Sequence, residues 1–378
     1  MSQQPLPHPQ SSPALPPALV SLGFKPSHAA AFALIAERGL LAARVARADR
    51  DRLLVLTAPG ETPRPAVVRG RLRHEAASPA DLPAVGDWVA IEPATDGPSL
   101  IHAVLPRASA FTRLDVGRET LEQVVAANVD VLFLVSGLDR DFNPRRIERF
   151  VVGAWESGAR PVVVLNKADL LDEAELDRRI GAIQAGAPGV PVIAVSAAEG
   201  AGLEALTPHL APGSTVALVG SSGVGKSTLI NALLGEARLD TGEVRADDQR
   251  GRHTTTWREL VALPGGALLV DTPGMRRLAL WGDEGEAMLE RGFADVDALA
   301  AACRFRDCAH QGEPGCAVDA AAADGTLEPG RLANWQKLRR ELRAFEIRHD
   351  ARAQKAEKAR WKTISKTVRA HMKRKYGE

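Results

Sequence analysis

Cysteine is scarce in this sequence, with three residues among 378. All three lie in one short segment, at Cys303, Cys308 and Cys316. Three thiols cannot pair off completely, so a framework of structural disulfides is disfavoured. A metal site is therefore the stronger interpretation of the cluster.

Long apolar runs are also missing. No stretch approaches the length of a membrane-spanning helix, and the first 20 residues lack the basic start, apolar core and cleavage site of a secretory leader. We therefore expect a cytoplasmic chain with no membrane partner. No solenoid-type repeat is present. What remains is an ordinary globular composition, with 45% hydrophobic and 25% charged residues.

Net charge is small, at +1, but it is unevenly distributed. Residues 331–378 hold 16 Lys and Arg against 5 Asp and Glu, which leaves the rest of the chain at −10. A basic tail on an acidic body indicates an anionic partner, with nucleic acid the leading candidate. A solvated helix that packs through an apolar stripe over Leu332–Ala370 is the alternative.

The pattern along the chain predicts a multidomain protein with four segments. Residues 1–42 form an N-terminal extension, rich in Pro, Gln and Ser to about residue 18 and partly disordered. A short helical lead-in is expected from Leu22 to Arg38. Residues 43–113 show short apolar runs split by turns, which predict a small β-barrel. Patterning alone does not separate an oligonucleotide-binding (OB) barrel from other small barrels.

The remaining segments predict an α/β domain over residues 118–282 and a helical, metal-binding domain over 283–378. Fully apolar runs are typical of a parallel sheet covered on both faces. Such runs occur at 131–135, 161–165, 192–195, 216–219 and 268–270. Helix patterns lie between them, including Arg145–Ser157 and Lys226–Leu234.

A phosphate-binding loop follows the fourth of these runs and precedes a helix. It matches the pattern G-x-x-x-x-G-K-[ST], in which backbone N–H groups and the helix N-terminus surround phosphates. We expect Lys226 to reach the β- and γ-phosphates and Ser227 to bind Mg²⁺. A glycine-rich turn is the alternative, and the strand-to-helix context disfavours it. The candidate residues are Gly220, Ser221, Ser222, Gly223, Val224, Gly225, Lys226, Ser227 and Thr228.

A guanine-reading tetrad, Asn166-Lys167-Ala168-Asp169, lies upstream of that loop, although it ordinarily comes after it. The Asp169 carboxylate can accept hydrogen bonds from N1–H and the 2-amino group of guanine, and adenine offers neither donor. The stem of Lys167 can cover the purine ring. Ser196-Ala197 follows the next strand and can offer a backbone N–H to the base. The reversed order predicts a circularly permuted GTPase.

The switch segments are expected downstream. Asp271 should hold the Mg²⁺ shell, and the N–H of Gly274 can contact the γ-phosphate. A threonine of the Arg252–Thr256 stretch should complete the shell, with Thr255 as the working assignment. Met275 stands where many GTPases carry a water-orienting glutamine, so we expect slow intrinsic hydrolysis. His253 is the candidate catalytic replacement, and an exposed loop histidine is the alternative.

Cysteine and histidine together form the pattern C-x4-C-x-H-x5-C. Three thiolates and one imidazole suit a closed tetrahedral structural Zn²⁺ site, which leaves no open position for catalysis. The predicted ligands are Cys303, Cys308, His310 and Cys316.

In this set and order, the motifs resemble those of the circularly permuted GTPases of small ribosomal subunit biogenesis, the RsgA family. The match runs from about residue 45 to the C-terminus and includes NKAD, GSSGVGKST, GRHTTT, DTPGM and the cysteine cluster. The resemblance implies an OB barrel, a permuted GTPase domain and a zinc domain. It also implies GTP hydrolysis to GDP stimulated by the small ribosomal subunit, contacts with its rRNA, and the cofactors Mg²⁺ and one Zn²⁺.

Two other functions stay open at this stage. One is a permuted GTPase acting on another ribosomal or RNA assembly, and the other is a nucleotide-regulated RNA-binding module. In each case we expect a monomer. We also expect the segment Asp271–Met275, which leads into the zinc domain, to transmit loss of the γ-phosphate to that domain.

Overall fold

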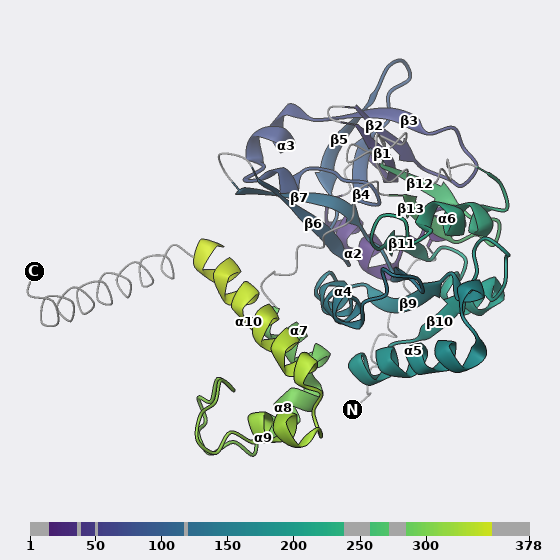
Figure 1. Ribbon diagram of the computed structural model, residues 1–378. Coiled ribbons are helices and arrows are strands. Elements are labelled where there is room, and N and C mark those ends of the chain that lie inside the picture. The colour runs from purple at the N-terminus through teal and green to yellow at the C-terminus, as the bar shows by residue number, and fades with distance from the viewer. Residues whose placement is uncertain are drawn as a thin grey trace, which may run out of the picture. The chain divides into compact units, whose positions relative to one another are not determined.

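The computed structural model describes residues 15–35, 39–49, 52–116, 120–237, 258–271 and 285–349 (Figure 1). The chain forms two compact units. The first comprises residues 1–142, 157–176 and 191–279, and the second comprises 143–156, 177–190 and 280–378. Across the described ranges, every helix is too short or too polar to cross a membrane.

Five strands close into the predicted barrel within the first unit. They are β1 (Leu41–Asp49), β2 (Arg52–Leu56), β3 (Arg64–Val68), β4 (Trp88–Glu92) and β5 (Ser99–Val104). They pair in the order β1-β2-β3-β5-β4, and β4 pairs back with β1, so no edge is left between these two strands. Short helices α3 (Gly70–Glu75) and η1 (Pro79–Asp81) connect β3 to β4. Alternate side chains fill the interior: Ala43, Val45, Val55, Val89, Ile91 and Ile101.

The α/β sheet of the first unit is also as predicted. Its parallel strands are β8 (Val131–Gly137), β9 (Arg160–Asn166), β10 (Val192–Val195), β11 (Thr215–Val219) and β13 (Leu268–Asp271), in the order β10-β9-β8-β11-β13. Every residue of β8 and β11 is buried, which explains their unbroken apolar runs. Helix α6 (Lys226–Leu234) follows β11, and the short helices η2 (Ala168–Leu170) and η3 (Leu203–His209) follow β9 and β10.

One strand joins the barrel to the parallel sheet. Strand β12 (Arg258–Ala262) pairs antiparallel with β13 on one side and with β1 on the other. The barrel and the α/β strands therefore form one continuous hydrogen-bonded sheet. A separate ribbon of β6 (Ala110–Val116) and β7 (Thr120–Ala127) spans the predicted boundary between residues 113 and 118.

The N-terminal lead-in differs from the single helix predicted from Leu22. Two helices form instead, α1 (Pro17–Ser21) and α2 (Pro26–Ile35), with Leu22 and Gly23 in the turn between them. Gly23 has a φ of +86°, a left-handed conformation that ends a helix, and Pro26 is suited to begin the next one. Leu22 and Phe24 pack against Trp88 of the barrel.

The second unit is helical. It contains α4 (Pro144–Glu156), α7 (Gly285–Gly292), α8 (Ala294–Ala300), α9 (Ala317–Asp324) and α10 (Pro329–His349), together with the part of α5 (Glu173–Gly186) from residue 177. Helix α4 and this part of α5 lie in the sequence range assigned to the GTPase domain. They nevertheless group with the C-terminal helices, so the predicted domain limits stay a prediction.

Buried Arg331 holds three segments of the second unit together. Its guanidinium donates to the carbonyl oxygens of Gly186 and Gly292, each at 2.9 Å, and binds both carboxylate oxygens of Asp295. It also lies over the ring of Phe293, 4.5 Å from the centroid. A buried guanidinium with its donors paired in this way fixes the packing of α5, α7 and α8.

Candidate nucleotide site and metal cluster

The predicted nucleotide motifs meet at one edge of the parallel sheet. Asn166, at the end of β9, is in register with Gly137 at the end of β8 and with Val195 at the end of β10. Strand β11 pairs with β8 in the same direction. All four strands therefore point their carboxyl ends to the same side, where ligands of α/β sheets bind.

The phosphate loop is shaped by close backbone approaches. A Cβ on Gly220 would lie 2.2 Å from the carbonyl oxygen of Val135, and one on Gly225 would lie 2.2 Å from Nδ2 of Asn166. Gly225 also has a φ of +91° at the start of α6. Lys226 Nζ donates to the carbonyls of Gly220, at 2.8 Å, and Ser221. The loop thus curls around the lysine ahead of the helix N-terminus.

Asn166 connects three motifs. Its buried side chain donates from Nδ2 to the carbonyl of Val224 in the phosphate loop at 2.8 Å. Its Oδ1 accepts from the backbone N–H of Ala197 at 3.0 Å. One amide therefore spans the tetrad, the phosphate loop and the Ser-Ala segment, as expected of a single composite site.

The two charged residues of the tetrad contact different segments, Lys167 the phosphate loop and Asp169 the Ser-Ala segment. Lys167 adopts a left-handed conformation, with φ 68°. Its Nζ contacts the carbonyl of Gly223 at 2.7 Å and Oδ2 of Asp139 at 2.6 Å. Asp169 accepts a hydrogen bond from Ser196 Oγ at 2.5 Å. Asp139 is not among the residues predicted from the sequence, where its one signal is a carboxylate shortly after a buried strand.

The hydrolytic side of the site lies largely outside the described residues. His253, Thr255 and Gly274 fall in ranges that the structure does not describe. Asp271 is placed by its backbone, at the end of β13 beside β11. Ser227 and Thr228 lie in the first turn of α6. The assignments for Mg²⁺ and for the attacking water therefore stay predictions.

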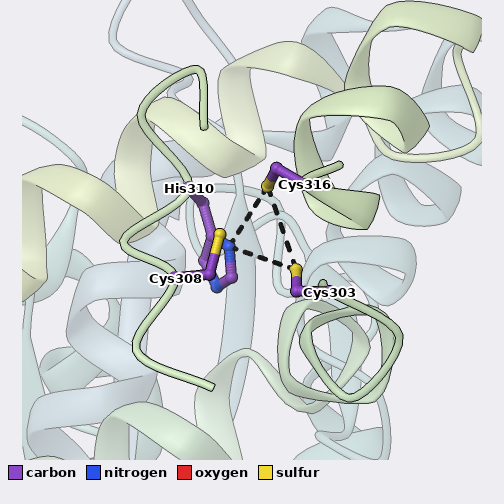
Figure 2. A group of neighbouring side chains, drawn as sticks. All are labelled: Cys303, Cys308, His310 and Cys316. Atoms are coloured by element: carbon purple, nitrogen blue, oxygen red, sulfur yellow. Dashed lines mark hydrogen bonds between the residues drawn. The ribbon is translucent and has the colours of Figure 1, made fainter. Parts of the chain in front are cut away.

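The four predicted zinc ligands converge (Figure 2). Cys303 Sγ lies 3.7 Å from His310 Nδ1 and 3.9 Å from Cys316 Sγ, and His310 Nδ1 lies 3.4 Å from Cys316 Sγ. A tetrahedron with Zn–S bonds of about 2.3 Å has sulfur–sulfur edges of about 3.8 Å. The donor set and its spacing are thus compatible with zinc.

Protonation in this cluster reflects its environment. Burial and the nearby Arg339 lower the pKa of His310, so its ring is neutral and able to bind a cation near pH 7. Burial raises the pKa of the Cys316 thiol to about 12. The Cys316 thiol would lose its proton when a cation binds, because the thiolate is the form that coordinates a metal.

The Glu313 carboxylate and the backbone N–H of Asp319 hold the loop that carries these ligands. Glu313 accepts from the backbone N–H groups of Ala309 at 3.0 Å and Gln311 at 2.6 Å. The N–H of Asp319 donates to Cys316 Sγ at 3.3 Å, at the start of α9. His310 itself has a φ of +56° and its ring lies 5.1 Å from that of Trp335. The metal loop is therefore anchored to the core of the second unit.

Comparison with known proteins gives a consistent family. A family profile described as RsgA GTPase matches residues 104–281. The small ribosomal subunit biogenesis GTPase RsgA of Opitutus terrae is 52% identical over 362 residues, covering 93% of this chain and 97% of its own length. The protein of the same name from Streptomyces avermitilis is 44% identical over 366 residues, covering 95% of each chain.

Solved structures agree at the level of the fold. YjeQ from Thermotoga maritima superimposes with a TM-score of 0.60 and 29% identity, covering 80% of this chain and 98% of that one. YloQ, described as a circularly permuted GTPase, superimposes with a TM-score of 0.56 and 23% identity, covering 81% and 96%. This chain thus shares its fold with both solved structures.

Proposed function

Because this chain belongs to the RsgA family of GTPases, we propose that it binds the small ribosomal subunit and its rRNA and hydrolyses GTP there during late maturation. The chain is a GTP hydrolase by family. Its products are GDP and phosphate. We further propose that it acts in the cytoplasm as a monomer.

One observation carries the assignment of the nucleotide site. The Asn166 side chain bridges the phosphate loop, at Val224, and the Ser-Ala segment, at Ala197. Phosphate binding and base reading are thereby held at a fixed spacing, which a nucleotide requires. Asp169 reads guanine through two donors that adenine lacks. Lys226 and the N–H groups of the loop hold the phosphates.

Hydrolysis uses residues around the γ-phosphate. Mg²⁺ would be held by Ser227 and, through its shell, by Asp271 and Thr255, and it would supply charge neutralisation. His253 orients the attacking water in place of a glutamine. Cys303, Cys308, His310 and Cys316 would hold one structural Zn²⁺ in the second unit.

GTP turnover in the presence of separate ribosomal subunits tests the proposal. Phosphate release is measured for the chain alone, with purified small subunits and with purified large subunits. We expect slow release alone and strong stimulation by small subunits only. Replacement of GTP by ATP is the control for base reading, and it should abolish turnover.

Two other outcomes would point to other functions. Stimulation by large subunits alone would indicate a permuted GTPase of another assembly. RNA binding with no stimulation by either subunit would indicate a nucleotide-regulated RNA-binding module whose hydrolysis is incidental. Either result would overturn the small-subunit assignment.

A further inference from the structure

Asp139 lies in the loop after β8, outside every motif that the sequence singled out. Its Oδ2 accepts from Lys167 Nζ at 2.6 Å, and its Oδ1 accepts from the N–H of Asp141 at 3.0 Å. Both oxygens are therefore committed, and the side chain has one defined orientation. About a third or less of each partner is exposed, 28% for Asp139 and 31% for Lys167.

The backbone beside Asp139 leaves room for this orientation. A Cβ on Gly137 would lie 2.9 Å from Oδ1 of Asp139, so a larger residue there would push the carboxylate aside. Gly137 is also the last residue of β8 and is in register with Asn166 of the tetrad. The carboxylate is thus positioned by the same strand pairing that positions the tetrad.

Lys167 links this carboxylate to the phosphate loop. Its Nζ also donates to the carbonyl of Gly223 at 2.7 Å. The aliphatic stem of Lys167 must therefore extend from the end of β9 toward the phosphate loop, held at its far end by two acceptors. A lysine side chain left free would lose considerable rotamer entropy on being ordered by a ligand.

The ionic state of Asp139 suits this contact. Partial burial raises its pKa, but the hydrogen bond from Lys167, the N–H of Asp141 and the lysine charge outweigh this effect and hold the pKa below its ordinary value. The carboxylate is thus ionised across the neutral range, where its attraction for the ammonium group is complete.

We propose that Asp139 is a positioning residue for guanine nucleotides, which holds the Lys167 ammonium so that the lysine stem is already extended along the base site before the nucleotide binds. The proposal rests on the proposed assignment of the tetrad as the guanine site. It extends the base-reading machinery to a residue beyond the four-residue motif. Preorganisation of this kind improves affinity by reducing the ordering cost of binding.

The position of the contact determines which measurements should change. Asp139 acts at the base side of the site, so GTP and GDP should be affected equally. The rate constant for hydrolysis of bound GTP should be unchanged, because no group at the γ-phosphate moves. KM should therefore rise while kcat stays constant.

A double-mutant cycle with Lys167→Met tests the proposal. Methionine keeps an apolar stem but removes the ammonium group, and Asp139→Asn keeps the size of the carboxamide but removes the charge. We expect each single change to weaken binding of labelled GDP and GTP about twofold to fivefold, the upper range for a partly exposed ion pair. In the Lys167→Met background, Asp139→Asn should have no further effect.

A matched control and a positive reference make the outcomes separable. Asp172→Asn removes an equivalent charge three residues after the tetrad, where Oδ1 accepts from the N–H of Glu175, and it should leave affinity unchanged. Full affinity in Asp139→Asn, or losses that multiply with Lys167→Met, would overturn the proposal. If Asp169→Asn and Lys167→Met also bind normally, the guanine-site assignment itself fails.

Discussion

Gly225 shows how strongly one residue can constrain the nucleotide site. It has a positive φ, and the Asn166 side chain occupies the space that a Cβ at this position would need. The contact from Asn166 to the neighbouring Val224 carbonyl requires this close approach. At this scale, function depends on the absence of a single methyl group.

Replacement of Gly225 by Ala should displace Asn166 or the phosphate loop, because the new Cβ would lie 2.2 Å from Nδ2. We expect GTP affinity to fall by a factor of about ten or more while the fold is kept. Labelled-nucleotide titration measures this. Gly181→Ala in α5, where a Cβ meets no atom within 4 Å, is the control and should bind normally. Equal affinity in both variants would contradict the role of the Asn166 contact.

His253 gives a second prediction at the residue scale, from sequence alone. Replacement by Ala should reduce turnover on the ribosomal particle by a factor of about 100 or more, the range for loss of a general acid–base group. GTP affinity should stay within about twofold of the original, since the phosphate loop and tetrad are unchanged. Single-turnover phosphate release and nucleotide titration separate the two quantities. Parallel losses in both would remove His253 from the catalytic role.

At the scale of secondary-structure elements, Arg44 connects several segments of the first unit. It is buried on β1 and donates to carbonyl oxygens from three segments, those of Leu22, Gly86 and Asn128. Its guanidinium also lies 5.5 Å from the centre of the Trp88 ring. One side chain thereby joins the turn between α1 and α2, the barrel, and the entry to the parallel sheet.

Substitution of Arg44 by Met keeps most of the volume but removes the donor to the carbonyls of Leu22 and Asn128, whereas the Gly86 carbonyl keeps a hydrogen bond from Nδ2 of Asn128. We expect a loss of about 2 to 3 kcal/mol in unfolding free energy, the usual cost of buried unpaired polar groups. Denaturant titration followed by circular dichroism measures it. The exposed Arg71, paired with Glu75 on α3, offers Arg71→Met as a control that should leave the unfolding midpoint nearly unchanged. An unchanged midpoint for Arg44→Met would show that these hydrogen bonds are not needed for stability.

His28 on α2 makes docking of the N-terminal helices sensitive to pH. Burial lowers its pKa from 6.5 to about 4; the side chain of Asn128 and, to a smaller extent, Asp130 oppose this lowering, while Arg44 and Lys25 add to it. Nδ1 already accepts the N–H of Lys25, so the neutral ring is the form that fits. Between these two pKa values the unfolded chain binds a proton that the folded chain does not. The contribution of His28 to the free energy of unfolding is therefore fully present above about pH 6.5 and decreases as the pH falls toward 4.

The expected loss from His28 is about 2 to 3 kcal/mol between pH 6.5 and 4.5. Unfolding free energies of the original chain and of His28→Leu, measured at several pH values, would reveal the difference. The His28→Leu curve should be flatter over this interval. Parallel curves would mean that other groups account for the acid sensitivity.

At the scale of the whole molecule, two compact units divide the work. The first holds the nucleotide motifs in one continuous sheet with the barrel, and the second holds the cysteine cluster in a helical core. Cys316 is itself part of that core, beside Val318 and Trp335. A bound metal would therefore stabilise the second unit rather than the nucleotide site.

Removal of the metal should therefore destabilise the second unit and leave nucleotide binding by the first unit unchanged. We expect one zinc per chain by elemental analysis, loss of part of the helical signal on treatment with a strong chelator, and GTP affinity within about twofold of the untreated value. Cys308→Ser should reproduce the effect of the chelator. Ser12→Ala, far along the chain from the cluster, serves as the control. Absence of zinc together with unchanged melting would contradict a structural metal.

Much of the site was predictable because its signals are local. The spacing of Gly220–Ser227, the tetrad at Asn166–Asp169 and the four metal ligands each occupy a short run whose chemistry needs those residue types. Asp139 and Arg44 were not predictable in this way. Each acts through partners far along the chain, and neither stands in a recognisable pattern.

By itself, the sequence determined the order of the motifs, the buried strands and the clustering of the metal ligands, since all of these follow from periodicity and short-range spacing. Tertiary structure alone decided that β12 pairs with β1, that α4 groups with the C-terminal helices, and that Asp139 meets Lys167. These features depend on strand pairing and packing between distant segments. Such contacts are set by the free energy of the whole fold rather than by any local pattern.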